Sequence, residues 1–245
     1  MIVVIGGTGF IGSRVVAKLG EDGHEAVAAS RNTGVNTLTG EGLADALAGA
    51  AVLVDVSNVQ GLEGAAMLEF FETSTRNLLA AAVPGVRHYV ALSVVGCDRL
   101  PDSGYLRAKV AQGELIEKSA VPYSLIYATE VFEYIPGIAD SATEAGAVRI
   151  APVRFQPLAL DDLVQVIARI AVGSPLNGRV EVAGPEQYRM DELFRTALAA
   201  RDDSREVITD KHARYFGTEL SERSLIPAGE AILGEVSYRE WLAGH

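Results

Sequence analysis

The chain has a single cysteine, Cys97, so no disulfide can form within it. It also lacks an excess of basic residues. The 21 Lys and Arg face 32 Asp and Glu, and the net charge of −11 would repel nucleic-acid phosphates and anionic lipids. No stretch approaches the roughly 18 consecutive apolar residues that a membrane helix needs. We therefore expect a cytoplasmic protein that binds neither nucleic acid nor membrane.

Metal-ligand spacing, internal repeats and proline-rich linkers are missing as well. The four histidines show no zinc-type spacing to one another or to Cys97, so we expect no metal. With 245 residues, 49% of them hydrophobic, the chain can bury one sizeable core. We predict a single domain over residues 1–245, with a core of roughly 1–150 and a smaller lobe built mainly from 151–245. A monomer and a homodimer are both compatible with the sequence.

Short apolar runs alternate with longer segments of helical periodicity, which is typical of βα units that wind a parallel sheet. The predicted strands cover residues 2–5, 25–29, 52–56, 89–93, 124–127 and 179–182. Most are continuously apolar, as expected for strands covered on both faces. The pattern also indicates a brief strand at 35–38, a short helix ending at Ala48 and a helix over 190–200. We predict an α/β fold, a doubly wound parallel Rossmann sheet with a small C-terminal lobe on the substrate side.

Residues 6–12 read Gly-Gly-Thr-Gly-Phe-Ile-Gly and lie between a predicted buried strand and an amphipathic helix. In that context the glycines indicate a turn that holds the diphosphate of a dinucleotide. Gly6 begins the tight turn, Gly9 lets the backbone approach the phosphates, and Gly12 allows the helix to pack closely on the strand. The helix N-terminus then offers its N–H groups to the anion. The alternative is a glycine-rich turn that binds nothing.

The second predicted strand ends in Ala28-Ala29-Ser30-Arg31-Asn32, without a carboxylate. A carboxylate there would bind the ribose 2′-hydroxyl of NAD. The guanidinium of Arg31, together with the hydroxyl of Ser30, suits the 2′-phosphate of NADP instead. We therefore expect NADP(H) as the cofactor, the alternative role for Arg31 being that of an ordinary surface residue.

A candidate proton-transfer group follows the strand that ends at Ser93. Tyr105 and Lys109 lie four residues apart on a predicted helix, so they share one face. A neighbouring ammonium stabilises a phenolate and lowers the pKa of the phenol from its usual value of about 10. Ser93 would then hydrogen-bond a substrate oxygen, Tyr105 would exchange its proton, and a nicotinamide would carry the hydride. Without Ser93 and the glycine turn, a Tyr and a Lys at this spacing would indicate only a helix surface.

The glycine turn, Ser93 and the run Tyr-Leu-Arg-Ala-Lys together resemble the short-chain dehydrogenase/reductase superfamily. Residues 121–132, 157–162 and 182–185 resemble its atypical, NmrA-like branch, so the resemblance covers most of the chain. It implies an NADP-binding Rossmann fold whose C-terminal lobe roofs the pocket. It also implies a set of cofactor neighbours: Thr8, Phe10, Ile11, Arg31, Ser57 and Asn58, with Thr129 and Phe132 bordering the nicotinamide.

The resemblance leaves three functions open: a reductase of small carbonyl compounds or quinones, a non-catalytic NADP(H) sensor, and an epimerase or isomerase. The sequence departs from the typical and extended groups. Val56-Ser57-Asn58-Val59 replaces the Asn-Asn-Ala-Gly stretch of typical members, and the longer substrate domain of sugar-nucleotide epimerases is missing. The presence of Tyr105 and Lys109 favours the reductase. The sequence assigns no role to the aromatic residues near His212.

Overall fold

The computed structural model describes residues 1–59, 61, 64–82 and 85–244. Its largest sheet has seven strands in the order β14-β9-β5-β4-β3-β1-β2. β1 pairs in parallel with β2 and β3, β3 with β4, and β9 with β14. The strands are β1 (Ile2–Ile5), β2 (Ala26–Ala29), β3 (Val52–Asp55), β4 (His88–Val94), β5 (Tyr123–Ala128), β9 (Gly178–Ala183) and β14 (Ala231–Leu233). All but β14 were predicted, with ends that agree to within one residue.

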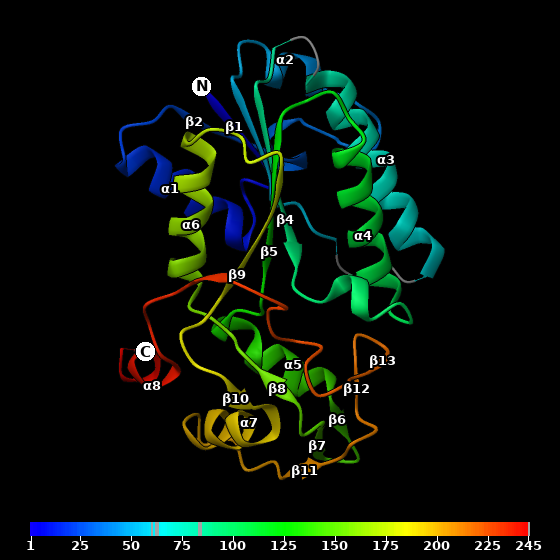
Figure 1. The fold of residues 1–245 in the computed structure, drawn as a ribbon, viewed down its shortest axis with the longest axis vertical. Helices are drawn as coiled ribbons and strands as arrows, with labels where there is room; N and C mark the ends of the chain where they lie inside the picture. The colour runs from blue at the N-terminus through cyan, green and yellow to red at the C-terminus, as the bar shows by residue number, and fades with distance from the viewer. Residues whose placement is uncertain (60, 62–63, 83–84, 245) are drawn as a thin grey trace. The chain divides into compact units, whose positions relative to one another are not determined.

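Helices cover both faces of this sheet (Figure 1). On one face lie α1 (Phe10–Glu21) and α6 (Leu160–Val172), and on the other lie α3 (Gly64–Ala82) and α4 (Gly104–Glu117). α1 buries Val15 and Leu19, as their helical spacing predicts. All four residues of β1 are buried, which explains their continuous apolar run. The fold is therefore the predicted doubly wound α/β sheet of the Rossmann type.

The strand order reverses direction beside β1. The chain runs from β1 to β2 on one side and then returns to place β3 on the other side of β1. In doubly wound sheets, such a switch point opens a crevice at the carboxyl ends of the strands, and ligands bind there. The residues that follow β1 and β3 therefore occupy the position in which this fold binds ligands.

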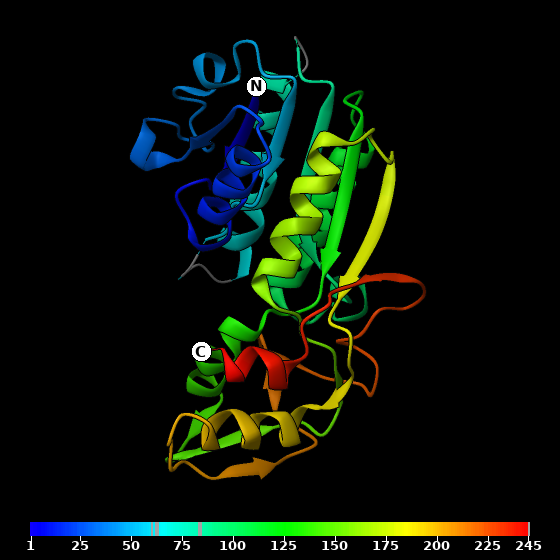
Figure 2. The same cartoon turned by 90° about the vertical axis from the view of Figure 1, so that its left-hand side faces the viewer.

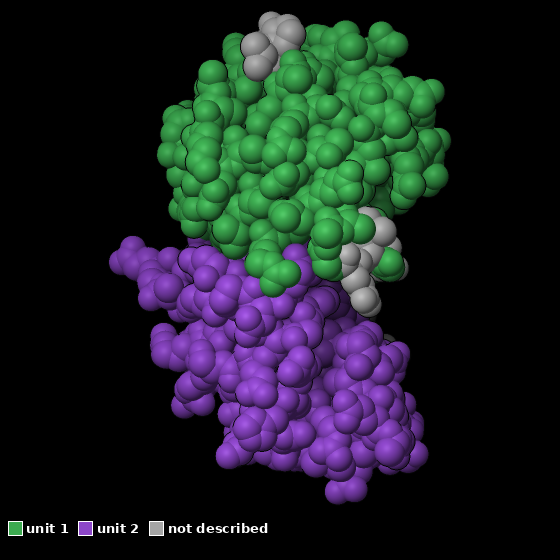
Figure 3. Space-filling model, turned by 90° about the vertical axis from the view of Figure 1, so that its right-hand side faces the viewer, with its two compact units in different colours: residues 1–93, 107–127, 164–180 green, residues 94–106, 128–163, 181–245 purple. Residues whose placement is uncertain are grey.

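The chain packs as two compact units, which Figure 3 shows in different colours. Unit 1 comprises residues 1–93, 107–127 and 164–180, and unit 2 comprises residues 94–106, 128–163 and 181–245. The units alternate along the chain, so neither corresponds to one continuous half of the sequence. The organisation as one domain, with a core of 1–150 and a lobe of 151–245, stays a prediction.

Unit 2 contains short strands and helices around a core of its own. A three-stranded sheet has the order β11-β7-β6, and α7 lies beside β7 and β11 (Figure 2). β10 pairs with β8 and β12 with β13, both antiparallel. Outside the seven-stranded sheet, the elements of this unit include η2 (Cys97–Arg99), η3 (Phe132–Tyr134), α5 (Ile135–Ser141), β6 (Thr143–Glu144), β7 (Ala147–Ile150), β8 (Arg154–Phe155), β10 (Tyr188–Arg189), α7 (Met190–Ala199), β11 (Val207–Thr209), β12 (Arg214–Tyr215), β13 (Thr218–Glu219) and α8 (Tyr238–Ala243).

The strand predicted at 35–38 is wrong, whereas the neighbouring short helix is confirmed as α2 (Leu43–Leu47). Residues 35–38 are not in a strand, and a turn begins at Thr37, because the side-chain oxygen of Asn36 accepts a hydrogen bond from the backbone N–H of Leu38 at 3.0 Å. The side chain of Asn77 on α3 also donates to the carbonyls of Thr37 and Leu38, which no sheet neighbour uses. β2 is consequently an edge strand of the seven-stranded sheet.

The helix expected over 190–200 is confirmed as α7, which buries Leu193, Phe194 and Leu198 on one face. In the part of the chain that the structure describes, no helix is both long and apolar enough to cross a membrane.

Candidate functional site

The glycine turn between β1 and α1 is packed as closely as its sequence indicates. Gly6 has φ +76°, and a Cβ there would lie 3.0 Å from the Cα of Ser57, just after β3. At Gly12, a Cβ would lie 2.1 Å from the Gly6 carbonyl oxygen. A side chain at either position would therefore push α1 or the end of β3 away. The turn thus lies at the switch point of the sheet, beside the carboxyl end of β3.

The N-terminus of α1 begins at a glycine rather than at a capping side chain. The cap residue, Gly9, makes no side-chain hydrogen bond, and the first turn contains no acidic residue. Gly9 and Phe10 are exposed, and the Arg14 guanidinium lies 4.4 Å from the centre of the Phe10 ring. The N–H groups at the start of α1 and the positive end of the helix dipole favour an anion at this point. The glycine turn and the start of α1 thus leave a space that side chains in place of the glycines would fill. This space fits the diphosphate of a dinucleotide.

The carboxyl end of β2 is connected to the glycine turn by a hydrogen bond. The Thr8 hydroxyl donates to the Ser30 Oγ at 2.9 Å, and Ser30 also caps the short helix η1 (Arg31–Thr33). Arg31 is exposed at the start of η1. Among the described residues, its guanidinium has no carboxylate partner. The arrangement leaves the exposed Arg31 guanidinium one residue after Ser30, which is bonded to the glycine turn.

A buried carboxylate, which the sequence did not reveal as special, ends β3. Asp55 is 1% exposed and accepts hydrogen bonds from the Ser57 hydroxyl at 2.6 Å and the Ser57 N–H at 3.0 Å. Its other oxygen accepts from the Gln112 amide at 3.0 Å and from the Tyr89 hydroxyl at 3.2 Å. Burial, followed by the charge of Asp55, raises the pKa of Tyr89 well above its usual value. Tyr89 therefore serves as a donor that stabilises the carboxylate.

Lys109 belongs to the same hydrogen-bonded network. Its Nζ donates to the Leu92 carbonyl at 2.8 Å and makes a short hydrogen bond to the Oε1 of Gln112, whose amide nitrogen bonds Asp55. The ammonium also lies 4.6 Å from the centre of the Phe71 ring, a cation–π contact. Lys109 is only 3% exposed, so these partners replace the water that its charge would otherwise need. Gln112 thus connects a buried ammonium to a buried carboxylate and fixes the position of Lys109.

Replacing Gln112 with leucine should lower the free energy of unfolding by about 1–3 kcal/mol, because the change leaves Lys109 and Asp55 each without one buried partner. Chemical denaturation of the purified protein measures the effect. Gln165 on α6 is exposed and provides the matched control, since Gln165→Leu should change stability by less than about 0.5 kcal/mol. Equal effects of the two substitutions would contradict the role given to Gln112.

Ser93 and Lys109 both belong to unit 1 and are connected through Leu92. Ser93 is the penultimate residue of β4 and is 5% exposed. Its neighbour in the chain, Leu92, supplies the carbonyl that Lys109 bonds. Ser57 and the exposed Asn58 follow the adjacent strand, β3, as the sequence predicted. Unit 1 therefore brings together the glycine turn, Ser57, Ser93 and Lys109 at the carboxyl ends of its strands.

Tyr105 lies on α4, four residues before Lys109, but belongs to unit 2. Its ring centre lies 5.3 Å from that of Phe216, which belongs to the same unit. Thr129, after β5, is 6% exposed and its hydroxyl donates to the Gln156 carbonyl at 2.7 Å. Phe132 is 1% exposed and packs against two aromatic rings of α8. The cofactor roles predicted for Thr129 and Phe132 stay predictions.

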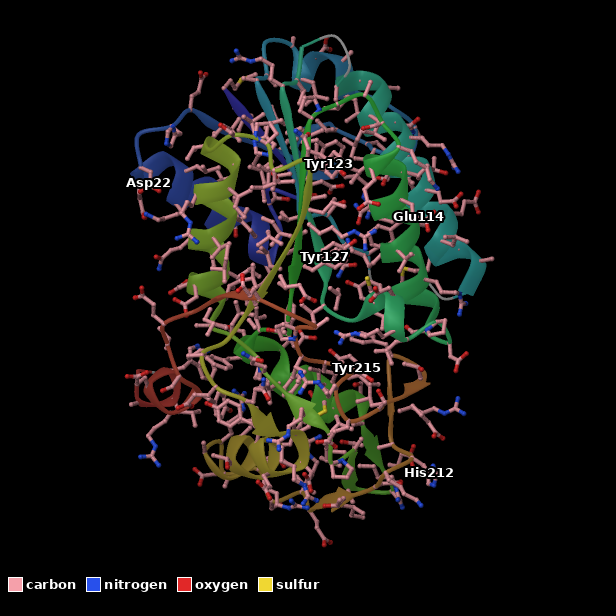
Figure 4. The ribbon with its side chains drawn as sticks, viewed as in Figure 1. Asp22, Glu114, Tyr123, Tyr127, His212 and Tyr215 are labelled. Carbon is pink, nitrogen blue, oxygen red and sulfur yellow. The ribbon has the colours of Figure 1, made fainter. Side chains whose placement is uncertain are left out.

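Unit 2 also contains a carboxyl group whose charge is disfavoured. Glu130 accepts a hydrogen bond from the Tyr215 hydroxyl at 2.8 Å and from the Val131 N–H at 3.2 Å. Burial raises the pKa of Glu130, and it raises the pKa of Tyr215 well above its usual value. Tyr215 comes from the β12–β13 hairpin, where Figure 4 labels it. The pair therefore fixes the hairpin to the segment that follows β5.

Sequence reasoning missed Asp55, Gln112 and Glu130 because their roles depend on burial and on partners distant in the chain. One signal was present for Gln112, which lies one helical turn after Lys109 and on the same face. In the region described by the structure, no three His, Cys, Asp or Glu side chains group as ligands for a metal ion.

A comparison with protein-family models matches residues 2–93 to the NAD dependent epimerase/dehydratase family. No curated protein sequence matches the chain. The matched segment contains the glycine turn, Arg31, Ser57, Asn58 and Ser93, whereas Tyr105 and Lys109 lie beyond it. The match thus supports a chain that resembles epimerases and dehydratases over its first strands. The assignment to the NmrA-like branch stays a prediction.

Solved structures resemble the whole chain. A short-chain dehydrogenase/reductase superfamily protein from Agrobacterium tumefaciens with bound NAD has a TM-score of 0.75 at 18% identity, covering 100% of this chain and 95% of that one. The Bordetella bronchiseptica enzyme WbmG in complex with NAD and UDP has a TM-score of 0.73 at 14% identity, with coverage of 99% and 92%. The Thermus thermophilus UDP-glucose 4-epimerase complex with NAD gives 0.72 at 16%, with coverage of 98% and 96%. At these identities the likeness concerns the fold.

Proposed function

We propose that the protein is an NADP(H)-dependent oxidoreductase that reduces a small carbonyl compound or quinone. The observation that carries the proposal is the buried ammonium of Lys109. It is held at the Leu92 carbonyl beside Ser93 and lies four residues from Tyr105 on α4. A lysine that is 3% exposed is costly to bury, and its placement at the ligand-binding end of a Rossmann sheet supports a chemical role.

The residues of the glycine turn would hold the cofactor. The N–H groups at the start of α1 would bind the diphosphate, with Gly6, Gly9 and Gly12 giving access. Thr8, Phe10, Ile11, Ser57, Asn58 and Thr129 are the proposed neighbours of the remaining groups. When bound, the nicotinamide supplies the hydride.

The specificity for NADP(H) rests on Arg31. Its guanidinium is exposed at the carboxyl end of β2 and would bind the 2′-phosphate, which NAD lacks. The complexes named above contain NAD, so the preference for NADP belongs to this proposal alone. The missing carboxylate at the end of β2 supports the preference.

Residues of the chain itself would transfer the proton to the substrate. Tyr105 would donate its phenolic proton to the substrate oxygen while Ser93 hydrogen-bonds that oxygen. Lys109, on the same helix as Tyr105, would favour the phenolate that remains. Gln112 and the Leu92 carbonyl keep the Lys109 side chain in one orientation, so its charge is fixed before the substrate binds.

The test is the oxidation of NADPH, followed by its absorbance, with a panel of aldehydes, ketones and quinones. We expect turnover of at least one compound well above the rate without enzyme. If no compound is reduced, the oxidoreductase proposal is wrong. A non-catalytic NADP(H) sensor would then be favoured, and pull-downs with NADP⁺ and NADPH should recover different partners.

A second candidate is an epimerase, which the family match over residues 2–93 and the fold of UDP-glucose 4-epimerase favour. Such an enzyme uses its cofactor transiently and retains it. We expect the purified protein to exchange NADPH freely. Cofactor that stays bound through purification would favour the epimerase.

A further inference from the structure

The β12–β13 hairpin presents an aromatic side chain at its tip. Arg214 pairs with Glu219 and Tyr215 with Thr218, which leaves Phe216 and Gly217 as a two-residue turn. Both turn residues have positive φ, +47° at Phe216 and +81° at Gly217. This is the conformation of a type I′ turn, in which asparagine or glycine is usual at the first position. Phenylalanine is strained there, because its Cβ approaches the following carbonyl.

The strained residue is also half exposed. Phe216 is 50% exposed, so about half of its apolar surface remains available for contact. The combination of strain and exposure points to a role for this ring beyond the stability of the hairpin. Strained backbone often occurs where a side chain serves binding or catalysis.

The ring of Phe216 is held between two tyrosines of unit 2. Its centre lies 5.3 Å from that of Tyr105, with the planes at 38°, and 4.6 Å from that of Tyr215, with the planes at 80°. Tyr215 is itself buried and fixed by its 2.8 Å hydrogen bond to Glu130. Phe216 thus has a defined position beside the proposed proton donor. A substrate ring cannot lie between Phe216 and Tyr105. A ring placed between them would need the Phe216 and Tyr105 centres to be about 9 Å apart, whereas they are 5.3 Å apart.

We propose that Phe216 is a specificity-determining residue whose exposed surface packs against a flat ring of the carbonyl substrate while Tyr105 reaches the carbonyl oxygen. This inference rests on the proposed reductase function and deepens it. It specifies aromatic aldehydes and quinones as the preferred substrates, because flat rings pack on a phenyl ring by stacking or edge contacts that a saturated ring lacks.

The experiment compares substrates of similar size that differ in flatness. With saturating NADPH, kcat/KM is measured for benzaldehyde, 1,4-naphthoquinone and cyclohexanecarbaldehyde. Phe216→Asn should lower kcat/KM for the two flat compounds about tenfold and for cyclohexanecarbaldehyde less than about twofold. Asparagine suits the turn, which offsets the loss of the two ring contacts, so the variant should still fold. Phe216→Tyr should retain the preference for flat rings.

Leu233 provides the matched control, because it is 53% exposed in the same unit and Leu233→Asn should leave all three values unchanged. An equal loss on all three compounds, or no loss on any, would overturn the role of Phe216 while leaving the reductase intact. If the wild type reduces none of them, the proposed function fails instead. Calorimetric binding of the same compounds to the NADP⁺-loaded protein then decides. If the wild type binds the flat compounds more tightly than cyclohexanecarbaldehyde, and Phe216→Asn abolishes this difference, the role of Phe216 is supported. If the wild type binds all three compounds equally, the role of Phe216 is refuted.

Discussion

Replacing Tyr105 with phenylalanine is expected to lower kcat by about 10²–10⁴-fold on any substrate that the protein reduces. The substitution removes the hydroxyl that would donate the proton and keeps the ring, so the contact with Phe216 at 5.3 Å is retained. KM and the affinity for NADPH should change little, since the lost interaction is used in the transition state. Steady-state NADPH oxidation and a fluorescence titration of the cofactor provide the two measurements.

Tyr123 is the matched control for this substitution. It is the first residue of β5 and therefore lies at the end of the strand opposite the ligand-binding edge, and Figure 4 labels it. Tyr123→Phe should leave kcat within about twofold of the wild type. A Tyr105→Phe variant that keeps wild-type kcat would show that another group, or water, supplies the proton.

Replacing Arg31 with alanine should weaken the binding of NADPH about 10–100-fold and leave the binding of NADH unchanged. A charge-assisted hydrogen bond contributes about 1.5–3 kcal/mol, and each 1.4 kcal/mol corresponds to a tenfold change in Kd. The loss should be specific to NADPH because only this cofactor has the 2′-phosphate. Titration of the wild type and the variant with both reduced cofactors measures it.

Two further variants sharpen the test of Arg31. Arg31→Lys keeps the charge and loses the planar fork of donors, so its affinity for NADPH should lie between those of the wild type and the alanine variant. Arg76, an exposed residue paired with Glu72 on α3, is the control for the general loss of one positive charge. Equal affinity of the wild-type protein for NADPH and NADH would refute the assignment of Arg31.

The sheet and the glycine turn were predictable because both depend on local sequence patterns. Apolar runs such as Ile2–Ile5 show strands buried on both faces, and the glycines at 6, 9 and 12 show where no side chain fits. The false strand at 35–38 shows the limit of this reasoning. Its apolar residues suggested a strand, whereas the side chain of Asn36 stabilised a turn instead.

The environment of the candidate site could not be predicted, because it depends on contacts across long stretches of sequence. Gln112 and Asp55 are 57 positions apart, and Tyr215 and Glu130 are 85 apart. The sequence identified Lys109 as a candidate without showing that it is buried. The strained turn at Phe216 was also hidden, since phenylalanine followed by glycine is a weak hairpin signal compared with asparagine followed by glycine.

The pairing of β14 with β9 has a consequence for protein synthesis. Ala231 pairs with Glu181, so about fifty residues must be made after β9 before its neighbour exists. At roughly 5–20 residues per second, the nascent chain leaves that edge of β9 unpaired for several seconds. An open strand edge is a template for association with other chains. The interval between the synthesis of β9 and the synthesis of β14 is therefore when we expect aggregation at this edge to compete most strongly with folding.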